Sequence, residues 1–419
     1  MLTREENERL IRAAKGTPGG ELLRRYWQPV ALEEELPPGA PPRPVRVMGE
    51  DLVLFRDGSG RVGLMGLHCS HRKADLSYGR VEKDGLRCVY HGWLYGVDGR
   101  CLQQPGEPAG SSLKDEIRHL AYPCREVPGL ILAYLGPGEP PALPPFPFYS
   151  APRDHVWTKK FYHECNYLQG NEGNIDPQHL SFLHRVETGS SAGRADLLEA
   201  DVAPTIVVTE TAWGLRIDTV RETGPDERYV RTGNFIMPNL ASFVGGPLVP
   251  PNVEPPEANT GFSINWHVPI DDGTHWKFAI AYRSTGPVDA ALQERMTCQG
   301  LDAGYRMARN RRNRYLQDRD EMARDTYAGL GRNFYDHDHW VVESQGDVVD
   351  RTTEILGTTD RAIVLMRRQL LRAMEEVKAG RDPHFVRRAP GDYGLDDFFT
   401  GSSIEHPAPT RQPQPAPAK

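Results

Sequence analysis

The chain has no long apolar run and no excess of positive charge. No stretch approaches the roughly 18 consecutive apolar residues of a membrane-spanning helix. The opening MLTREENERLIRAAKG carries charges where a secretion signal needs an apolar core. With 50 Lys and Arg against 57 Asp and Glu, the net charge is −7, which disfavours the clustered basic surface of a nucleic-acid-binding protein. We therefore expect a cytoplasmic protein with neither a membrane nor a nucleic-acid partner.

Cysteine is also scarce, and two common redox motifs are missing. Six cysteines in 419 residues do not make the disulfide framework of a small secreted domain. No G-x-G-x-x-G follows a predicted strand, as a dinucleotide site requires, and no C-x4-C-x2-C of the plant-type ferredoxins occurs. The chain should therefore not draw electrons from NAD(P)H unaided.

The length allows two domains, because single cores stop growing near roughly 250 to 300 residues. Residues 44–66 alternate apolar and polar side chains around Asp57-Gly58, a pattern that predicts a β-hairpin. Strand patterns recur in 202–244 and 262–284, and apolar residues at helical spacing predict an amphipathic helix over 360–379.

These patterns predict an α+β protein in five segments. We expect an N-terminal helical segment (1–44) packing on the larger domain, a small all-β domain (45–140), a Pro-rich linker (141–154), a larger domain of helices and strands (155–400) and a disordered Pro-rich tail (401–419).

The segment HCSHRKADLSYGRVEKDGLRCVYHGW, residues 68–93, holds two mixed ligand pairs. Cys69 and His71 form the first pair, and Cys88 and His91 form the second. Structural zinc sites usually pair like ligands, C-x2-4-C and then H-x3-5-H. A Rieske [2Fe–2S] cluster instead needs two thiolates on one iron and two imidazoles on the other. The spacing favours the Rieske cluster, with a zinc site as the alternative.

The segment NYLQGNEGNIDPQHLSFLHR, residues 166–185, holds a candidate mononuclear metal site. Its possible ligands are His179 and His184, with Asp176 nearby. Two histidines and a carboxylate form the facial triad of non-haem Fe(II) oxygenases. On a regular helix the two histidines point about 140° apart, so a metal site requires a break between them. In the alternative, His179 caps a turn, His184 packs in a core, and Asp176 caps a helix before Pro177.

Both motifs resemble those of the Rieske non-haem iron oxygenases, C-P-H-R-G with C-x-Y-H-G-W, and D-x-x-H-x4-H. Ser70 and Lys73 depart from the first motif, but neither is a ligand. Ala74 and Tyr90 stand where respiratory Rieske proteins carry two extra cysteines, so the cluster should serve an oxygenase. The resemblance implies a small Rieske domain followed by a helix-grip (START-like) catalytic domain with an antiparallel sheet and a C-terminal helix.

The resemblance also implies the cofactors and the third metal ligand. The cofactors are one Rieske [2Fe–2S] cluster and one mononuclear Fe(II), with O2 as co-substrate. The stretch DHDHWVVESQG, residues 336–346, resembles the D-x4-E-x-x-G of the phthalate-dioxygenase branch. That register makes Asp338 the third ligand and Asp336 its rival, and leaves His337 and His339 as surface or supporting residues.

In the family, Asp176 corresponds to an inter-subunit electron bridge. It would bond a histidine of the mononuclear site and, across a head-to-tail trimer boundary, His71 or His91 of a neighbour. The resemblance thus implies a homo-oligomer, a trimer or a hexamer. It also implies a separate partner, a flavin/iron–sulfur reductase or a ferredoxin, through which NAD(P)H supplies the electrons.

The resemblance is to the homomeric branch that contains phthalate dioxygenase and the vanillate and dehydrodivanillate O-demethylases. It implies O-demethylation or ring hydroxylation of a small aromatic, carboxylated substrate. Arg216, Arg221 and Arg231 are candidates for binding the carboxylate, although 216 and 221 should face opposite sides of one strand. The alternatives are an oxygenase acting on another substrate, by N-demethylation or aliphatic hydroxylation, and a Rieske electron carrier.

Overall fold

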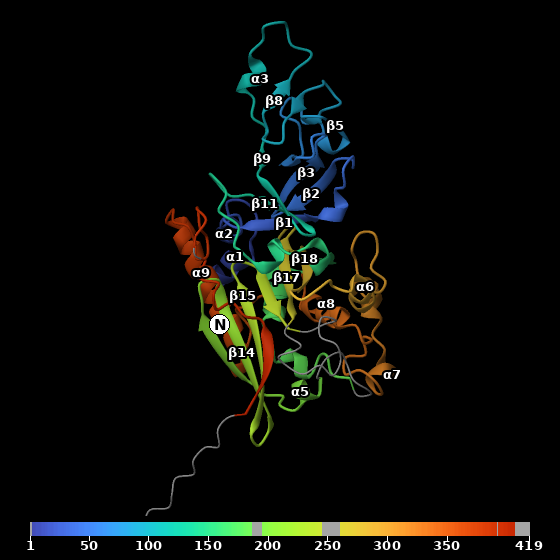
Figure 1. Ribbon diagram of the computed structural model, residues 1–419, viewed down its shortest axis with the longest axis vertical. Coiled ribbons are helices and arrows are strands. Elements are labelled where there is room, and N and C mark those ends of the chain that lie inside the picture. The colour runs from blue at the N-terminus through green and yellow to red at the C-terminus, as the bar shows by residue number, and fades with distance from the viewer. Residues whose placement is uncertain (1, 187–194, 245–259, 392, 407–419) are drawn as a thin grey trace, which may run out of the picture.

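The computed structural model describes residues 2–186, 195–244, 260–391 and 393–406. Figure 1 shows a small part made of short strands at one end of an elongated molecule, with a larger part built on a broad sheet below it. None of the helices within the described ranges is long and apolar enough to span a membrane.

The small part consists of two four-stranded antiparallel sheets, ordered β2-β3-β4-β9 and β5-β6-β7-β8. The predicted hairpin is present as β3 and β4, joined through Asp57. The small part has a hydrophobic core of its own, which includes Cys69 and Cys88. The strands are β2 (Arg43–Val47), β3 (Glu50–Arg56), β4 (Val62–Gly66), β5 (Arg80–Glu82), β6 (Gly85–Arg87), β7 (Leu94–Tyr95), β8 (Cys101–Gln103) and β9 (Ala121–Tyr122), with a short helix α3 (Leu113–Glu116).

The large sheet has eight antiparallel strands in the order β12-β18-β17-β16-β15-β14-β13, with β19 paired to β15. The strand patterns of 202–244 and 262–284 lie in it, and TIVVTE (205–210) matches β13 residue for residue. The strands are β12 (Val156–His163), β13 (Thr205–Glu210), β14 (Gly214–Gly224), β15 (Glu227–Ile236), β16 (Leu240–Phe243), β17 (Gly261–Pro269), β18 (His275–Arg283) and β19 (Gly401–Glu405).

Helices cover this sheet. The predicted C-terminal helix is α9, which buries Met366, Leu370 and Met374 and packs on β13 and β14 (Figure 1). The helices are α1 (Arg4–Ile11), α2 (Pro18–Leu23), α4 (Tyr167–Asn174), α5 (Ala195–Glu199), α6 (Ala290–Thr297), α7 (Arg319–Met322), α8 (Phe334–Ser344) and α9 (Arg361–Lys378). An α+β fold with a small all-β part, an antiparallel sheet and a C-terminal helix is thus confirmed.

Two segments differ from the expectation. Within the N-terminal segment, Trp27–Leu32 forms strand β1, which joins β11 (Leu130–Tyr134) and β10 (Cys124–Val127) in a three-stranded sheet. All six residues of β1 are buried. Burial in the core, and not helix propensity, therefore determines that this stretch forms a strand. The prediction of a disordered tail is wrong for residues 401–405, which form β19 against β15, and residues 407–419 lie outside the described ranges.

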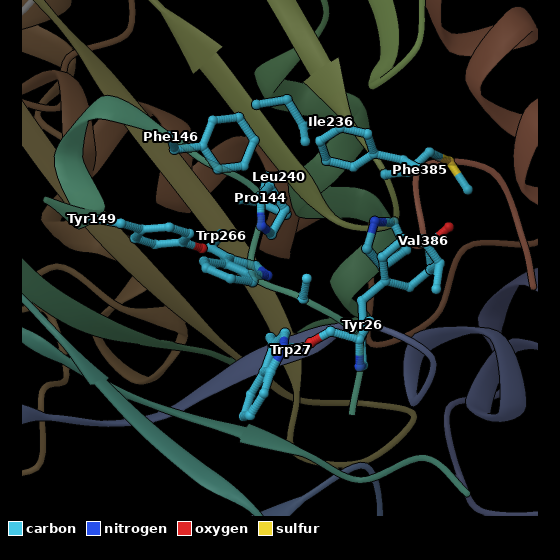
Figure 2. A pocket seen from close by; sticks show the side chains of 14 residues that line it. Tyr26, Trp27, Pro144, Phe146, Tyr149, Ile236, Leu240, Trp266, Phe385 and Val386 are labelled. Carbon is cyan, nitrogen blue, oxygen red and sulfur yellow. Dashed lines mark hydrogen bonds between the residues drawn. The ribbon is translucent and has the colours of Figure 1, made fainter. Parts of the chain in front are cut away.

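The Pro-rich segment after β11 packs against the core. Phe146 and Phe148 are buried, and Trp27 Nε1 donates a hydrogen bond to Pro141 O at 2.8 Å. Figure 2 shows Phe146 and Trp27 among the apolar side chains around a pocket of about 30 Å³. That volume holds about one water molecule, whereas a cavity that takes up benzene measures about 150 Å³. The pocket as it stands is therefore too small for an aromatic ligand.

Candidate metal centres

Two tight turns present the cysteines and histidines of the first motif. Backbone N–H groups of Lys73 and Gly92 donate to the carbonyls of Cys69 and Cys88, at 2.9 and 3.0 Å. Both turn residues have positive φ, +60° for Lys73 and +76° for Gly92. Lys73 stands where the motif usually has glycine, and the left-handed backbone explains that preference. The substitution is thus tolerated, with the turn kept.

The four side chains separate by type, as a Rieske cluster requires. Cys69 and Cys88 are buried in the core of the small part, whereas His71 is exposed and His91 half-buried. The two imidazole rings lie 4.5 Å apart, centroid to centroid. Among the residues that the structure describes, His91 Nδ1 has no hydrogen-bond partner. Two thiols inside and two imidazoles outside fit the ligand set of a [2Fe–2S] cluster.

Neighbouring groups fix these loops. The Tyr95 hydroxyl lies 3.1 Å from Cys69 Sγ, where it can donate to a thiolate. Ser70 Oγ lies 2.7 Å from His119 Nδ1, and His119 Nε2 lies 2.7 Å from the carbonyl of Gly66. A neutral His119 that donates from Nε2 therefore accepts from Ser70 at Nδ1. Ser70, which replaces the usual proline, thereby ties the first loop to the sheet.

His179, His184 and Asp338 come together, each with one ligand atom within 4.8 Å of the others. His184 Nε2 lies 3.0 Å and His179 Nε2 3.7 Å from Asp338 Oδ1. The predicted helix break is present, since a 3-10 turn over His179–Ser181 ends at Phe182. The structure thus assembles a 2-His-1-carboxylate set from two segments far apart in sequence.

His337 sets the tautomer of His184. His337 Nε2 donates to Gly331 O at 2.7 Å, which leaves its Nδ1 as the acceptor for His184 Nδ1–H at 3.1 Å. Burial lowers the pKa of His337 to about 4, so its ring is neutral. His184 Nε2 is then the nitrogen that can coordinate a metal. Of the two expectations for His337 and His339, a surface position is wrong, because both are buried, whereas a supporting role agrees with the bond from His337 to His184.

Charges around Asp338 keep it ionised. Burial raises the pKa of Asp338, but His184 and His179 lower it by more, so the pKa lies well below its usual value. Lys277, on β18, also lowers the pKa of Asp338. Its ammonium lies over the rings of Tyr335 and Phe161, 4.0 and 5.1 Å from their centroids. Sequence patterns did not single out Lys277, although a lysine in the apolar strand WKFAIAYR was a usable signal.

Two other acidic residues differ in their surroundings. Asp176 Oδ1 accepts from the Gln178 N–H at 2.9 Å, and its Oδ2 lies 3.9 Å from His179 Nδ1. It is therefore beside the triad, beyond direct hydrogen-bond distance. Asp336 lies outside the triad group, with Oδ2 at 3.8 Å from Arg309 Nε. Burial raises the pKa of Asp336 to about 6.

The three candidate arginines have different environments. Arg216 is half-exposed and pairs with Asp218 at 3.0 Å, and Arg231 donates to Val244 O. Arg221 is fully buried and donates from Nη2 to Pro177 O at 2.9 Å. Its Nε and Nη1 have no hydrogen-bond partner within the described part of the chain. Burial lowers the pKa of Arg221 to about 10. Of the three, Arg221 is thus the buried cation beside the loop that carries His179, with donors that no described residue accepts.

Comparison with known families gives two matches along the chain. Residues 26–121 match the model described as "Rieske [2Fe-2S] domain". Residues 133–387 match the model described as "LigXa C-terminal domain like". The second match spans more than half of the chain and includes all three triad residues.

Individual relatives agree with these matches. The phthalate 4,5-dioxygenase oxygenase subunit of Pseudomonas putida is 38% identical over 402 residues, covering 91% of this chain and 88% of the relative. The 5,5'-dehydrodivanillate O-demethylase oxygenase subunit of Sphingobium sp. (strain NBRC 103272 / SYK-6) is 36% identical over 406 residues, covering 93% and 84%.

Solved structures share the fold at lower identity. A caffeine-bound NdmA mutant of Pseudomonas putida CBB5 matches with a TM-score of 0.59 at 20% identity, covering 85% of this chain and 92% of that chain. The reduced oxygenase–ferredoxin complex of carbazole 1,9a-dioxygenase matches with a TM-score of 0.55 at 20% identity, covering 88% and 93%. From the matched families and the relatives above 30% identity, the chain belongs to the Rieske non-haem iron oxygenases, as an oxygenase subunit.

Proposed function

We propose that this oxygenase subunit uses O2 to oxidise an aromatic carboxylate, by O-demethylation or ring hydroxylation, at Fe(II) held by His179, His184 and Asp338. The observation that carries the proposal is the convergence of these three side chains in a chain with a Rieske ligand set. Fe(II) bound there supplies open coordination positions for dioxygen. Asp338 contributes the negative charge, and His337 holds His184 in the coordinating tautomer.

Arg221 is our candidate for binding the substrate carboxylate. Its buried guanidinium lies against the loop that carries His179, through Pro177 O, and two of its nitrogens have no hydrogen-bond partner among the described residues. A buried cation with free donors is stabilised by an anion. Lys277 adds a second positive charge near Asp338. Phthalate and dehydrodivanillate, which the two relatives' names give as substrates, are both aromatic carboxylates.

We further propose that the electrons come from a separate reductase or ferredoxin and that the chain works as a cytoplasmic homotrimer or hexamer. His71 is exposed, and Val89 and Tyr90 beside the second pair are 57% and 54% exposed. This surface can therefore meet another protein. In Figure 1 the strands that carry the Rieske loops lie at one end of the molecule, away from α8. This arrangement favours delivery of electrons to a neighbouring subunit through Asp176.

A single turnover of chemically reduced protein tests the function without knowledge of the partner. Protein with both iron sites filled would be mixed with O2 and a panel of methoxylated and plain aromatic acids, then assayed for formaldehyde and hydroxylated products. We expect product with at least one acid. Formaldehyde with loss of a methyl group identifies an O-demethylase, and ring-hydroxylated product without formaldehyde identifies a ring oxygenase. No product from any acid would refute the aromatic-carboxylate proposal.

A further inference from the structure

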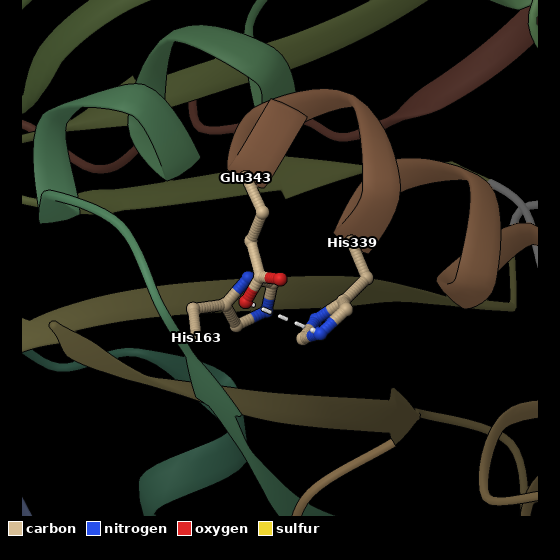
Figure 3. A group of neighbouring side chains, drawn as sticks. All are labelled: His163, His339 and Glu343. Carbon is tan, nitrogen blue, oxygen red and sulfur yellow. Dashed lines mark ion pairs between the residues drawn. The ribbon is translucent and has the colours of Figure 1, made fainter. Parts of the chain in front are cut away.

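A second group of metal-ligating side chains lies outside the triad. His163 ends strand β12, while His339 and Glu343 lie one turn apart on α8. One ligand atom of each lies within 4.8 Å of the others, and all three residues are buried. Figure 3 shows His339 and Glu343 projecting from the helix toward His163. The group thus joins the sheet to the helix that also carries Asp338.

Two histidines beside this group have complete hydrogen bonding. His275 Nδ1 donates to Cys165 O at 2.7 Å, so its Nε2 accepts from His267 Nδ1 at 2.9 Å. His267 Nε2 accepts in turn from Asn174 Nδ2 at 2.5 Å. Both rings are therefore neutral with fixed tautomers. A buried histidine of this region can be satisfied by protein atoms alone.

His163 and His339 do not follow that pattern. His163 is 1% exposed and stacks on His275, yet neither of its ring nitrogens has a hydrogen-bond partner in the described part of the chain. No described residue is a hydrogen-bond partner of His339 Nδ1 either. Buried polar atoms are rarely left unpaired, and each unpaired atom costs about 1 to 3 kcal/mol. Because a neutral imidazole has one lone pair and one N–H, these unpaired nitrogens indicate a missing partner that accepts one lone pair of His163, and His339 can bind the same partner through Nε2, which lies beside Glu343.

The carboxylate of this group is held for coordination. Glu343 Oε1 accepts from the Glu164 N–H at 2.5 Å, and Oε2 accepts from the Tyr315 hydroxyl at 2.8 Å. Each oxygen keeps a further lone pair, and such outer hydrogen bonds orient metal-binding carboxylates. Glu343 Oε1 lies 3.2 Å from His339 Nε2, close to the separation of about 3.4 Å between ligands of tetrahedral zinc.

There is also room and access. A cavity of about 170 Å³ adjoins the group: it is lined by His339 and Glu343, with Glu164, Arg306 and Met307 among its other walls, whereas His163 is not one of its lining residues. This volume can admit an ion and the water that commonly completes a three-residue zinc site. Asp338 and His339 are neighbours on α8, so their side chains leave the helix about 100° apart. The two groups consist of different residues, so the second group shares no ligand with the triad.

We propose that His163, His339 and Glu343 bind a second divalent transition-metal ion, Zn²⁺, separate from the mononuclear iron. Two imidazoles and a carboxylate are a zinc ligand set, as in zinc enzymes that keep a water in the fourth position. Zinc also binds such sites more tightly than Fe(II) does. The ion pins the end of β12 to α8 and so fixes the helix that presents Asp338.

Metal analysis of the full-length holoenzyme tests the site. Protein with filled iron sites would be incubated with Zn²⁺, desalted and analysed for zinc and iron, and its crystals would be examined by anomalous scattering at the zinc edge. We expect one zinc per chain with iron unchanged, and an anomalous peak between His163 and Glu343. Zinc gained only with an equal loss of iron would mean displacement at the triad, and would overturn the proposal.

Variants separate the two sites. His163→Gln and His339→Gln should lose at least about tenfold in zinc affinity while keeping the iron and the visible spectrum of the cluster. Asp338→Ala should lose mononuclear iron and keep the zinc. His275→Gln is the matched control, because its two nitrogens are already occupied, and should retain the zinc. Equal zinc binding by His163→Gln and wild type would refute the assignment.

Discussion

At the scale of single residues, His184 depends on His337 for the tautomer that binds a metal. The hydrogen bond between their Nδ1 atoms at 3.1 Å is set by the bond from His337 Nε2 to Gly331 O. Metal-bound histidines generally use such a partner, and its loss lowers metal affinity about 10- to 100-fold. The hydrogen bonds that run from Gly331 O through His337 to His184 therefore support the proposed metal site, in which His184 is the candidate ligand.

His337→Phe should weaken mononuclear iron binding by about 10- to 100-fold, because phenylalanine fills the space but cannot accept from His184 Nδ1–H. Iron affinity would be measured by chelator competition, with the [2Fe–2S] absorbance as an internal reference. His337→Asn is the matched control, since its side-chain carbonyl can accept at about the position of Nδ1. Equal iron affinity in the phenylalanine variant and wild type would contradict this role.

Arg221→Met should raise the KM for aromatic carboxylates by about tenfold or more, because removing one partner of a buried charge pair costs about 2 to 5 kcal/mol. The Arg221→Met variant should turn over the methyl ester of the same acid nearly as well as wild type does. Steady-state kinetics on the acid and its ester would measure the difference. Arg216→Met is the control, since Arg216 already pairs with Asp218 at the surface. An equal loss for acid and ester would argue against carboxylate binding.

The sequence allowed the candidate ligands to be named, but it did not allow the contacts of each side chain to be predicted. The spacing of Cys69, His71, Cys88 and His91 is local, so the sequence alone indicated the cluster ligands. The partnership of His337 with His184 was not predictable, because it depends on how α8 docks against the 3-10 turn. The two Arg221 nitrogens that have no partner in the described ranges were equally unpredictable, since the burial of one arginine among three is decided by the sheet as a whole.

At the scale of elements, a buried ion-pair network fixes the helices around the triad. Arg351 is fully buried and donates to both oxygens of Glu172 on α4. Arg367 on α9 donates to the same carboxylate at 2.7 Å and also pairs with Glu354. The network joins α4, which leads into the loop that carries His179 and His184, to the C-terminal helix. Arg351 is thus a structural anchor between these helices.

Arg351→Met should reduce the free energy of unfolding by about 3 to 5 kcal/mol, because it leaves part of the Glu172 charge buried without its partner. Urea denaturation followed by circular dichroism measures the loss. Arg153→Met, which removes an exposed pair with Glu33, should cost less than about 1 kcal/mol. Equal costs for the two variants would show that the buried network contributes no more than a surface pair.

The same network gives a pH dependence with a definite sign. Burial raises the pKa of Glu172, but Arg351 and Arg367 lower it by more, so the folded-state pKa lies below its usual value. A carboxyl of this kind stabilises the fold above its unfolded pKa, about 4.3, and the contribution is lost as the pH falls. The difference between wild type and Arg351→Met should therefore be largest near neutral pH and shrink below about pH 4.

Local pattern predicted most elements, and non-local pairing decided the rest. The strand TIVVTE and the helix ending before Gly380 follow from periodicity within a short window. Strand β1 pairs with β11, about a hundred residues further along the chain, and no local pattern specifies that partner. The same holds for β19, whose residues follow an irregular segment and extend only because β15 offers an edge.

At the scale of the whole molecule, our proposal requires electrons to cross between subunits. Asp176 is 26% exposed beside His179, and His71 is exposed on the Rieske loops. A head-to-tail ring brings one surface of each subunit against a different surface of the next. Such a ring can place the Rieske loops of one chain against Asp176 of its neighbour, and each turnover then depends on two chains.

Mixed trimers test this dependence. Chains with Cys69→Ser lack the Rieske cluster, and chains with Asp338→Ala lack the mononuclear iron, so neither homo-oligomer should turn over. Two different affinity tags would isolate oligomers that contain both chains. In a mixed head-to-tail trimer, one of the three interfaces joins an intact cluster to an intact triad, so the rate should be about one third of wild type.

Adding Asp176→Asn to the Cys69→Ser chain should abolish the turnover of the mixed trimer, because that chain holds the intact triad. The same change in the Asp338→Ala chain should leave the turnover unchanged. Inactive mixed trimers that retain their metals would mean that electrons do not cross between subunits.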